Sequence, residues 1–143
     1  NDLEVSDKVI DDTGKAVLRL MKRQTAPSWT LAGKFMTSGT PESTTKDQHV
    51  SEKSILNEAM CMMACQGHPN VVTFRGLYCD YDTSLQTQSY VLLMDYYPRG
   101  SLFTDLERSG FVYEVEDSLS VCHDVLSGLC YIHKQGVIHR DVK

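Results

Sequence analysis

The chain has 143 residues, which is about the size of one domain. Its 14 Lys and Arg residues are outnumbered by 19 Asp and Glu, for a formal charge of −5, and this balance argues against a general polyanion-binding surface because such surfaces depend on clustered Lys and Arg. The 41% hydrophobic content is enough for a packed core and excludes a mainly disordered chain.

The first part of the chain has the pattern of strands broken by turns. Strands are predicted at 3–10, 16–21 and 29–36, with polar turns between them. Short turns cannot make parallel connections, so these segments are expected to form an antiparallel meander. The small-residue, Pro-containing stretch 37–45 is predicted to be a loop.

A helix is predicted next. Thr45 and Gln48 have the spacing of a capping box, and Ile55 and Ala59 begin an apolar pattern at helical spacing. Pro69 is expected to end the helix, because proline disfavours helical geometry in the residue before it. Further strands are predicted at 71–79 and 90–96. The run 90–94 shows no alternation, so we expect that strand to be covered on both faces.

Two helices are predicted after the last strand, a short one at 101–108 and a long one at 114–135. Acidic residues in the first turn of the long helix favour the positive helix end, and Gly136 is placed to terminate it. One face of this helix carries an apolar stripe, which is expected to need a partner surface and consists of Leu119, Cys122, Val125, Leu126, Leu129 and Ile132.

The most specific pattern is an ordered series of short motifs. The series is Ala32-x-Lys34 at the end of a strand, Glu58 on a helix, Gly-His-Pro-Asn-Val-Val at 67–72, Leu-Met-Asp-Tyr at 93–96 before Pro-Arg-Gly-Ser-Leu, and His139-Arg140-Asp141-x-Lys143. In this order the motifs resemble those of the eukaryotic protein kinases of the Ser/Thr type. The resemblance covers nearly the whole chain.

The resemblance implies an α+β fold. The expected architecture is a five-stranded antiparallel sheet with one helix, forming the N-lobe and hinge at 1–97, followed by the first helices of an incomplete α-helical C-lobe at 98–143. The family's later Asn and Asp-Phe-Gly motifs, which hold magnesium, do not occur in the sequence. We therefore expect a fragment that is inactive alone, taken from a protein that phosphorylates Ser or Thr of a protein substrate.

The resemblance also implies catalytic roles. Phosphoryl transfer mainly requires that the protein position the reacting groups and compensate the charge of the phosphates. Lys34 matches the lysine that holds the α- and β-phosphates of ATP, and Glu58 matches its anchoring carboxylate, with Glu52 as the weaker candidate. Asp141 matches the catalytic aspartate that accepts or orients the substrate hydroxyl proton. Lys143 matches a lysine that stabilises the transferring phosphate and is typical of Ser/Thr kinases.

Further positions are implied to contact the nucleotide. Met94 would be the gatekeeper side chain behind the adenine, while Asp95 and Tyr97 would contact the base through backbone groups. Val17 and Ala32 would sandwich the base from above. Ser101 stands near the position at which the family contacts ribose. The expected cofactors are ATP and Mg²⁺, with the metal ligands lying beyond this chain.

This chain departs from the family's pattern at the glycine-rich phosphate loop. If Val17 is the valine of the loop, the three glycine positions become Ile10, Asp12 and Lys15. Glycines let backbone amides approach phosphates closely, whereas side chains there, and especially those of Asp11 and Asp12, would crowd and repel ATP. A pseudokinase or scaffold with weak or no ATP binding therefore stays open as the alternative.

The remaining composition bears on location and partners. The longest apolar runs, 59–65 and 90–94, are too short to cross a bilayer, and no leader opens the chain, although its first residue is Asn. The five cysteines have no Cys-x-x-Cys spacing, which favours free thiols in a reducing compartment. We expect a cytoplasmic or nuclear protein with no nucleic-acid or membrane partner and no metal site within this chain.

Overall fold

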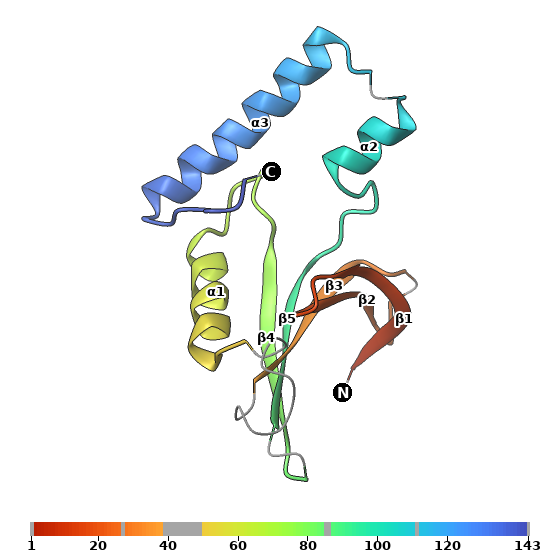
Figure 1. Ribbon diagram of the computed structural model, residues 1–143, viewed down its shortest axis with the longest axis vertical. Helices are drawn as coiled ribbons and strands as arrows, with labels where there is room; N and C mark the ends of the chain where they lie inside the picture. Colours follow the sequence, from red (N-terminus) through yellow and green to blue (C-terminus); the bar gives the residue numbers. More distant parts are fainter. Residues whose placement is uncertain (1, 27, 39–49, 85–86, 111, 143) are drawn as a thin grey trace. The chain divides into compact units, whose positions relative to one another are not determined.

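The structure is a computed structural model and describes residues 2–26, 28–38, 50–84, 87–110 and 112–142. Its contacts divide the chain into two compact units, one made of Asn1–Met63 and Thr73–Tyr96 and the other of Ala64–Val72 and Tyr97–Lys143. Figure 1 shows the elements of each unit along the chain. The predicted capping pair Thr45 and Gln48 lies outside the described residues.

The first unit contains a five-stranded antiparallel sheet. Its strands are β1 (Leu3–Asp12), β2 (Val17–Arg23), β3 (Leu31–Ser38), β4 (Phe74–Asp82) and β5 (Thr87–Asp95). They are arranged in the order β1-β2-β3-β5-β4, and each neighbouring pair is antiparallel. The predicted meander at the start of the chain and the predicted five-stranded sheet are both confirmed.

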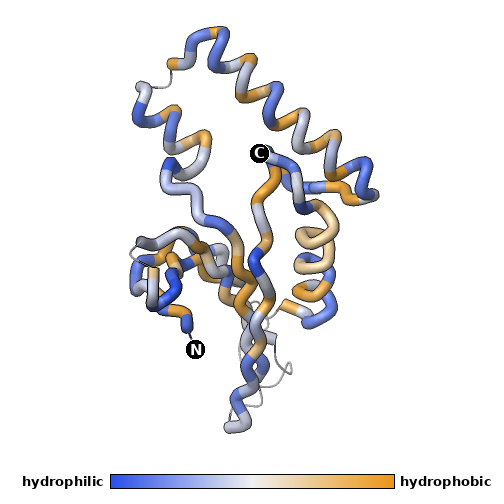
Figure 2. Tube along the Cα trace, turned by 180° about the vertical axis from the view of Figure 1, so that it is seen from behind, coloured by the Kyte–Doolittle hydropathy of each residue, from blue (hydrophilic) through white to orange (hydrophobic). Residues whose placement is uncertain are grey.

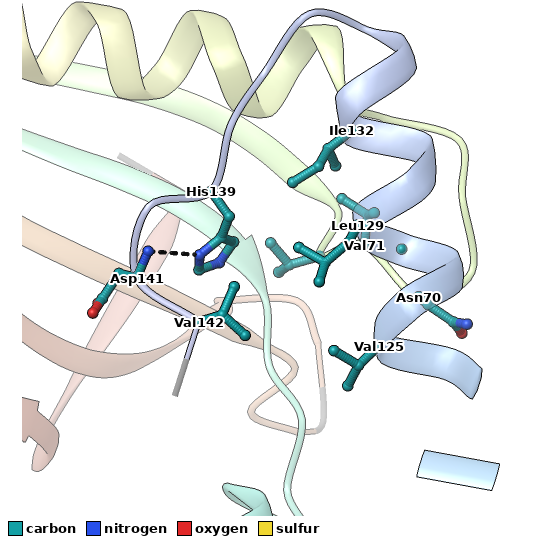
Figure 3. Close-up of a pocket in the computed structure, with 10 residues that line it drawn as sticks. Asn70, Val71, Val125, Leu129, Ile132, His139, Asp141 and Val142 are labelled. Carbon is teal, nitrogen blue, oxygen red and sulfur yellow. Dashed lines mark hydrogen bonds between the residues drawn. The ribbon is translucent and has the colours of Figure 1, made fainter. Parts of the chain in front are cut away.

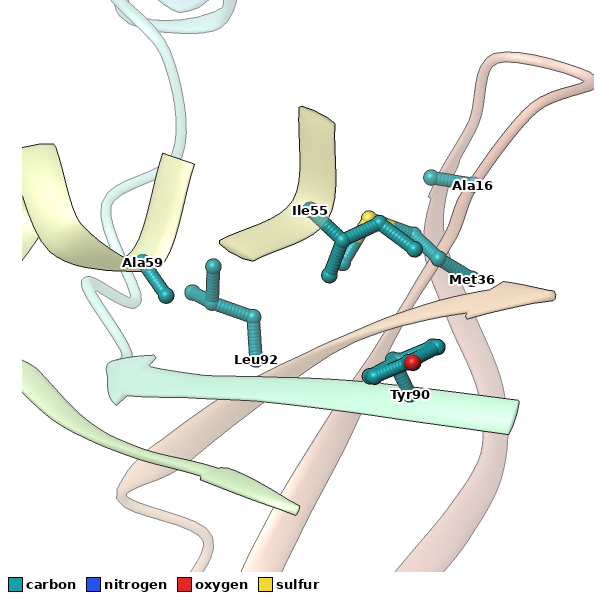
Figure 4. Packing of buried hydrophobic residues seen from close by; sticks show 6 residues of the cluster. All are labelled: Ala16, Met36, Ile55, Ala59, Tyr90 and Leu92. Atoms are coloured by element: carbon teal, nitrogen blue, oxygen red, sulfur yellow. The ribbon is translucent and has the colours of Figure 1, made fainter. Parts of the chain in front are cut away.

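One face of this sheet packs against helix α1 (Glu52–Ala64). Ile55 and Ala59 of the helix are buried, and the same cluster includes Met36, Tyr90 and Leu92 from the strands and Ala16 just before β2 (Figure 4). The helix begins after Ser51, whose Oγ accepts a hydrogen bond of 3.2 Å from the backbone N–H of Ser54. This is the N-cap arrangement that small hydroxyl residues favour.

The opposite face of the central strands is covered as well. Leu92 is fully buried on one face of β5, and its neighbour Leu93, on the other face, is only 3% exposed. Gly33 explains part of this packing, because a Cβ atom built there would overlap Sδ of the buried Met21. The expectation that residues 90–94 are covered on both faces is therefore confirmed, and methionine fills the space that a larger residue at position 33 would take.

The second unit is built on α2 (Leu102–Arg108) and α3 (Val115–Lys134), which match the predicted helices closely. Hydrophobic and hydrophilic positions alternate along α3 (Figure 2). Gly136 ends α3 at φ 77°, with its N–H bonded to His133 O and the N–H of Val137 bonded to Ile132 O. These two bonds form a Schellman motif, in which glycine is favoured because an L side chain is strained at positive φ.

The segment 64–72 packs on α3. Tyr131 Oη donates a 2.6 Å hydrogen bond to Gln66 O, and its ring stacks on His68 with centroids 4.9 Å apart. Asn70 Nδ2 donates to Asp124 O at 3.0 Å. A Cβ atom at Gly128, in the middle of α3, would lie 2.8 Å from Asn70 O. Glycine at this position therefore allows the segment to approach the helix backbone.

This packing corrects one predicted boundary. A strand was expected to begin at Val71, whereas β4 begins at Phe74. The N–H of Val71 instead closes a turn on His68 O, and Val71 and Val72 line a pocket beside α3. Their apolar character therefore reflects contact with a helix rather than membership of the sheet.

Candidate functional site

The candidate functional residues of the first unit include an ion pair between β3 and α1. Lys34 Nζ lies 2.6 Å from Glu58 Oε1 and 2.9 Å from Glu58 Oε2, so both carboxylate oxygens accept hydrogen bonds from one ammonium group. The side chains remain 30% and 38% exposed, so the pair is accessible to a ligand. Glu52, the other candidate carboxylate on α1, instead accepts a hydrogen bond from Tyr90 Oη.

Strand register decides which side chains share a face with this pair. In the antiparallel ladder Ala32 is opposite Met94 and Lys34 is opposite Leu92. Residues directly opposite each other point to the same face, and alternate residues along a strand do so too. Ala32, Lys34 and Met94, three of the residues predicted to contact nucleotide, therefore lie on the face that packs against α1.

Val17 does not share this face. It is opposite Phe35 in the β2–β3 ladder, whereas Lys34 is opposite Leu18 and Ala32 is opposite Leu20. The expectation that Val17 and Ala32 lie on the same side of a nucleotide is thus wrong in this register. Leu18 and Leu20 are the residues of β2 that share the face of Lys34 and Ala32, and sequence reasoning did not name them. Only the register of the hairpin, which the sequence pattern did not supply, could have identified them.

The tip of the β1–β2 hairpin is hydrogen-bonded to itself. The N–H of Gly14 donates to Asp12 Oδ1 at 2.8 Å, the N–H of Asp12 donates to Asp11 Oδ1 at 2.9 Å, and the N–H of Thr13 donates to Ala16 O at 3.1 Å. A phosphate-binding loop needs such amides to point at the ligand. Here carboxylates occupy two of them, so this tip does not fit a phosphate group as it stands.

Asp95 carries its side chain on the face opposite Met94. Its carboxylate forms a two-bond ion pair with Arg75 of β4, at 2.6 Å from Nε and 2.9 Å from Nη2. The hydrogen bond from Arg75 holds the pKa of Asp95 below its ordinary value of 3.8, against the opposing effect of partial burial. The N–H of Asp95 donates to Thr73 O at 3.1 Å. These contacts fix the end of β5 to the start of β4.

In the second unit, Asp141 lies at the rim of a pocket of about 330 Å³ formed with α3 and the 70–72 segment. Figure 3 shows its carboxyl group pointing away from the apolar side chains of Val71 and Leu129. Its N–H donates to His139 Nδ1 at 3.3 Å. Arg140 between them has φ 65°, a conformation rare for a residue with a side chain and typical of functional sites.

The other predicted positions of the second unit have simpler surroundings. Tyr97 is 54% exposed, and its carbonyl accepts a hydrogen bond from Gly100 N. Ser101 is the N-cap of α2, with Oγ accepting a 3.1 Å bond from Thr104 N. Lys143 lies outside the described residues. Within the part of the chain that the structure describes, no group of three His, Cys, Asp or Glu residues is placed to hold a metal ion.

None of the helices in the described segments is long and apolar enough to cross a membrane.

Comparison with known families adds a decisive observation. The model of the protein kinase domain family matches residues 16–143. The chain belongs to the protein kinase family. The sheet with α1 agrees with the N-lobe of a kinase, and α2 and α3 agree with the start of its C-lobe. The predicted family and fold class are thus confirmed.

Individual kinases are similar over about two thirds of the chain. Serine/threonine-protein kinase CLA4 of Candida albicans is 32% identical over 97 residues, which cover 68% of this chain and 9% of the relative. Cell division control protein 7 of Schizosaccharomyces pombe is 34% identical over 93 residues, covering 65% of this chain and 8% of the relative. Serine/threonine-protein kinase CST20 of Candida albicans is 34% identical over 97 residues, covering 68% and 7%. The chain thus spans less than a tenth of the length of these kinases.

Proposed function

We propose that the complete protein containing this chain transfers the terminal phosphoryl group of ATP to Ser or Thr hydroxyls of a protein substrate. The observation that carries the proposal is the Lys34–Glu58 pair, with both carboxylate oxygens within 2.9 Å of the ammonium. An ammonium held in this way is positioned to compensate phosphate charge, which is the main requirement of phosphoryl transfer. The names of the similar kinases and the residue Lys143 support Ser/Thr as the acceptor.

Each residue has one role in the proposed reaction. Lys34 would bind the α- and β-phosphates, and Glu58 would keep the ammonium in place. Asp141 would accept the proton of the substrate hydroxyl as its oxygen bonds to the γ-phosphorus. The bond from that phosphorus to the β,γ-bridging oxygen would break at the same time, and ADP would leave with the electron pair of the broken bond.

The nucleotide would lie against the face that carries Lys34. Ala32 is small and 4% exposed, which suits close approach of a flat base, and Met94 and Leu18 share its face. The backbone of Asp95 and Tyr97 and the hydroxyl of Ser101 stay proposed contacts. Protein kinases in general use Mg²⁺ to neutralise phosphate charge. We assign no residue of this chain to the metal.

Activity of the complete protein tests the proposal. Lys34→Met and Asp141→Asn are each expected to lower kcat/KM with Mg-ATP and a protein substrate about a hundredfold or more. Lys53→Met, at an exposed lysine of α1, and Asp117→Asn, at an exposed aspartate of α3, are the matched controls and should retain activity. Phosphoamino-acid analysis of the product should find phosphoserine or phosphothreonine. Phosphotyrosine alone would contradict the Ser/Thr proposal.

A pseudokinase or scaffold is the second candidate function, and the self-bonded hairpin tip favours it. The carboxylates of Asp11 and Asp12 accept hydrogen bonds from two backbone N–H groups of the tip. Nucleotide affinity would then be low, and the fold would serve as a binding module. A thermal-shift titration of the complete protein with Mg-ATP separates the two candidates, because a ligand that binds only the native state raises its stability. No shift at millimolar Mg-ATP would favour the scaffold.

We also propose a cytoplasmic or nuclear location. None of the five cysteines, all of which lie in the described segments, is in a disulfide bond, and this suits a reducing compartment. Imaging of the tagged complete protein tests this, and a signal confined to the secretory pathway would contradict it.

A further inference from the structure

A second polar contact joins α1 to the sheet, away from the Lys34–Glu58 pair. Tyr90 of β5 is 2% exposed, and its hydroxyl donates a 2.7 Å hydrogen bond to Glu52 Oε1 in the first turn of α1. A buried hydroxyl without a partner would be costly, so this bond favours one position of the helix end over others. Burial, and then the hydrogen bond to Glu52, raise the pKa of Tyr90 above its ordinary value of 10.0, against the opposing effect of a hydrogen bond with Ser38.

The two polar contacts hold the helix at separate points. Glu52 and Glu58 are six residues apart, which is about 9 Å along the axis of an α-helix. On the sheet, Tyr90 is two residues from Leu92, the residue directly opposite Lys34, and is itself opposite Met36. The spacing of the sheet partners, about 7 Å along a strand, is thus similar to the spacing of the two carboxylates on the helix.

The surface between these points is packed. Ile55 is fully buried and Ala59 is 7% exposed, and both belong to the same hydrophobic cluster as Tyr90 and Leu92. The backbone adds a contact before the helix begins, because the N–H of Val50 donates to Thr37 O of β3 at 3.4 Å. Apolar packing holds the helix on the sheet without fixing its direction. Two polar contacts about two turns apart restrict rotation of the helix over the sheet as well.

We propose that Tyr90 and Glu52 form a positioning pair for phosphoryl transfer, which orients α1 so that Glu58 reaches Lys34. The proposal rests on the proposed kinase function, because orienting Glu58 matters to activity only if Lys34 binds phosphates. Neither residue touches the reacting groups. Loss of the pair leaves Lys34 and Glu58 intact and lowers the fraction of molecules in which they are joined.

The kinetic test uses variants of the complete protein. Tyr90→Phe keeps the ring in the core and removes the donor, and it is expected to lower kcat/KM for ATP about tenfold, the size expected for a hydrogen bond to a charged group. Glu52→Ala should cause the same loss, whereas Glu52→Gln keeps an accepting oxygen and should restore most of the activity. Tyr81→Phe, at a 55% exposed tyrosine on β4, is the matched control and should have no effect.

A background variant separates positioning from a general loss of stability. The Glu58→Gln variant already lacks the carboxylate that the pair is proposed to orient. Adding Tyr90→Phe to this variant should change kcat/KM by less than twofold, because contributions that act through one residue are not additive. An equal tenfold loss in both backgrounds would overturn the proposal. Wild-type activity in Tyr90→Phe would overturn it as well.

Hydrogen exchange of the 52–64 backbone amides gives a readout that does not depend on catalysis. Exchange at the start of α1 should be faster in Tyr90→Phe than in the wild type and in Tyr81→Phe. Unchanged exchange overturns the positioning pair whether or not the protein is active. If exchange changes as expected but wild type and Lys34→Met are equally inactive, the pair is a contact of the fold alone, and it is the kinase function that fails.

Discussion

At the scale of single residues, Asp95 has a carboxylate with a defined partner at the end of β5. Its bonds to Arg75 stabilise the charged form, which is why its pKa lies below 3.8. A group whose folded-state pKa is lowered stabilises the fold above its unfolded-state pKa, and this contribution is lost as the pH falls through the folded-state value. The side chain of Arg75 is 51% exposed, so solvent screening keeps the contribution small.

We therefore predict that Asp95→Asn lowers the free energy of unfolding by less than about 1 kcal/mol near pH 7. The difference from wild type should shrink as the pH falls below 3.8, the ordinary value for this carboxyl, since the wild type loses its charge as well. Urea unfolding across pH 2.5–7 checks this. Arg75→Gln should raise the pKa of Asp95 in a carboxyl NMR titration, and a difference independent of pH would contradict the argument.

A second residue-scale prediction concerns Asp12, whose Oδ1 accepts from the N–H of Gly14. Asp12→Gly frees this amide and removes a negative charge, so affinity for Mg-ATP should rise about fivefold, the value of one hydrogen bond. Asp12→Asn keeps an acceptor for Gly14 and removes only the charge, so it separates the two effects. Calorimetric titration of the complete protein measures the affinities. Equal affinity in wild type and Asp12→Gly would mean that the hairpin tip does not face the nucleotide.

At the scale of elements, the packing of the 64–72 segment on α3 depends on Gly128. Alanine is the better helix former by about 1 kcal/mol, and yet a Cβ atom there would lie 2.8 Å from the backbone oxygen of Asn70. We predict that Gly128→Ala is destabilising by about 1–3 kcal/mol, as for other overpacked sites. Hydrogen exchange of the α3 amides should become faster. Ser120→Ala at an exposed position of α3 is the control, and increased protection in Gly128→Ala would contradict the prediction.

The contact between β2 and β3 gives another element-scale prediction. Valine at position 33 would overlap Sδ of Met21, so Gly33→Val should cost about 1–3 kcal/mol of stability. Met21→Ala alone should cost about 2–5 kcal/mol because it leaves a cavity. In the double variant the valine fills that cavity, so the combined loss should be smaller than the sum of the single losses. Denaturant unfolding of the four proteins measures the coupling, and strict additivity would contradict it.

These elements also show what the sequence could reveal. The antiparallel meander, the helix carrying Ile55 and Ala59, and the long helix ending at Gly136 follow from local periodicity and turn residues, and all were predicted. The pairing of Lys34 with Glu58 came from resemblance to a family. Local patterns could not reveal that Val17 and Lys34 lie on opposite faces, because register depends on how the hairpin closes.

Longer-range packing was also beyond the sequence pattern. Val71 and Val72 have the composition of a strand, but they line a pocket beside α3 and β4 begins only at Phe74. The Tyr90–Glu52 bond was missed for the same reason, since a tyrosine in a hydrophobic strand gives no sign of a polar partner 38 positions earlier in the chain. Contacts between residues distant in sequence therefore account for the main differences.

At the scale of the whole molecule, the two compact units are interleaved along the chain. The first unit is interrupted after Met63, resumes at Thr73 and ends at Tyr96, while the segment between belongs with α3. No single cleavage of the backbone separates the two units. The segment 64–72 therefore precedes α3 in the chain, although Gln66 and Asn70 of this segment form hydrogen bonds with residues of that helix.

This arrangement has a consequence for synthesis on the ribosome. The partners of Gln66 and Asn70 in α3 follow them by 65 and 54 residues, respectively. At translation rates of about 5–20 residues per second, roughly 3–13 s pass between the synthesis of the segment and that of the helix on which it packs. During this interval Val71 and Val72 lack their apolar neighbours on α3. The nascent chain therefore exposes a short hydrophobic segment after α1, and a chaperone can bind such a segment.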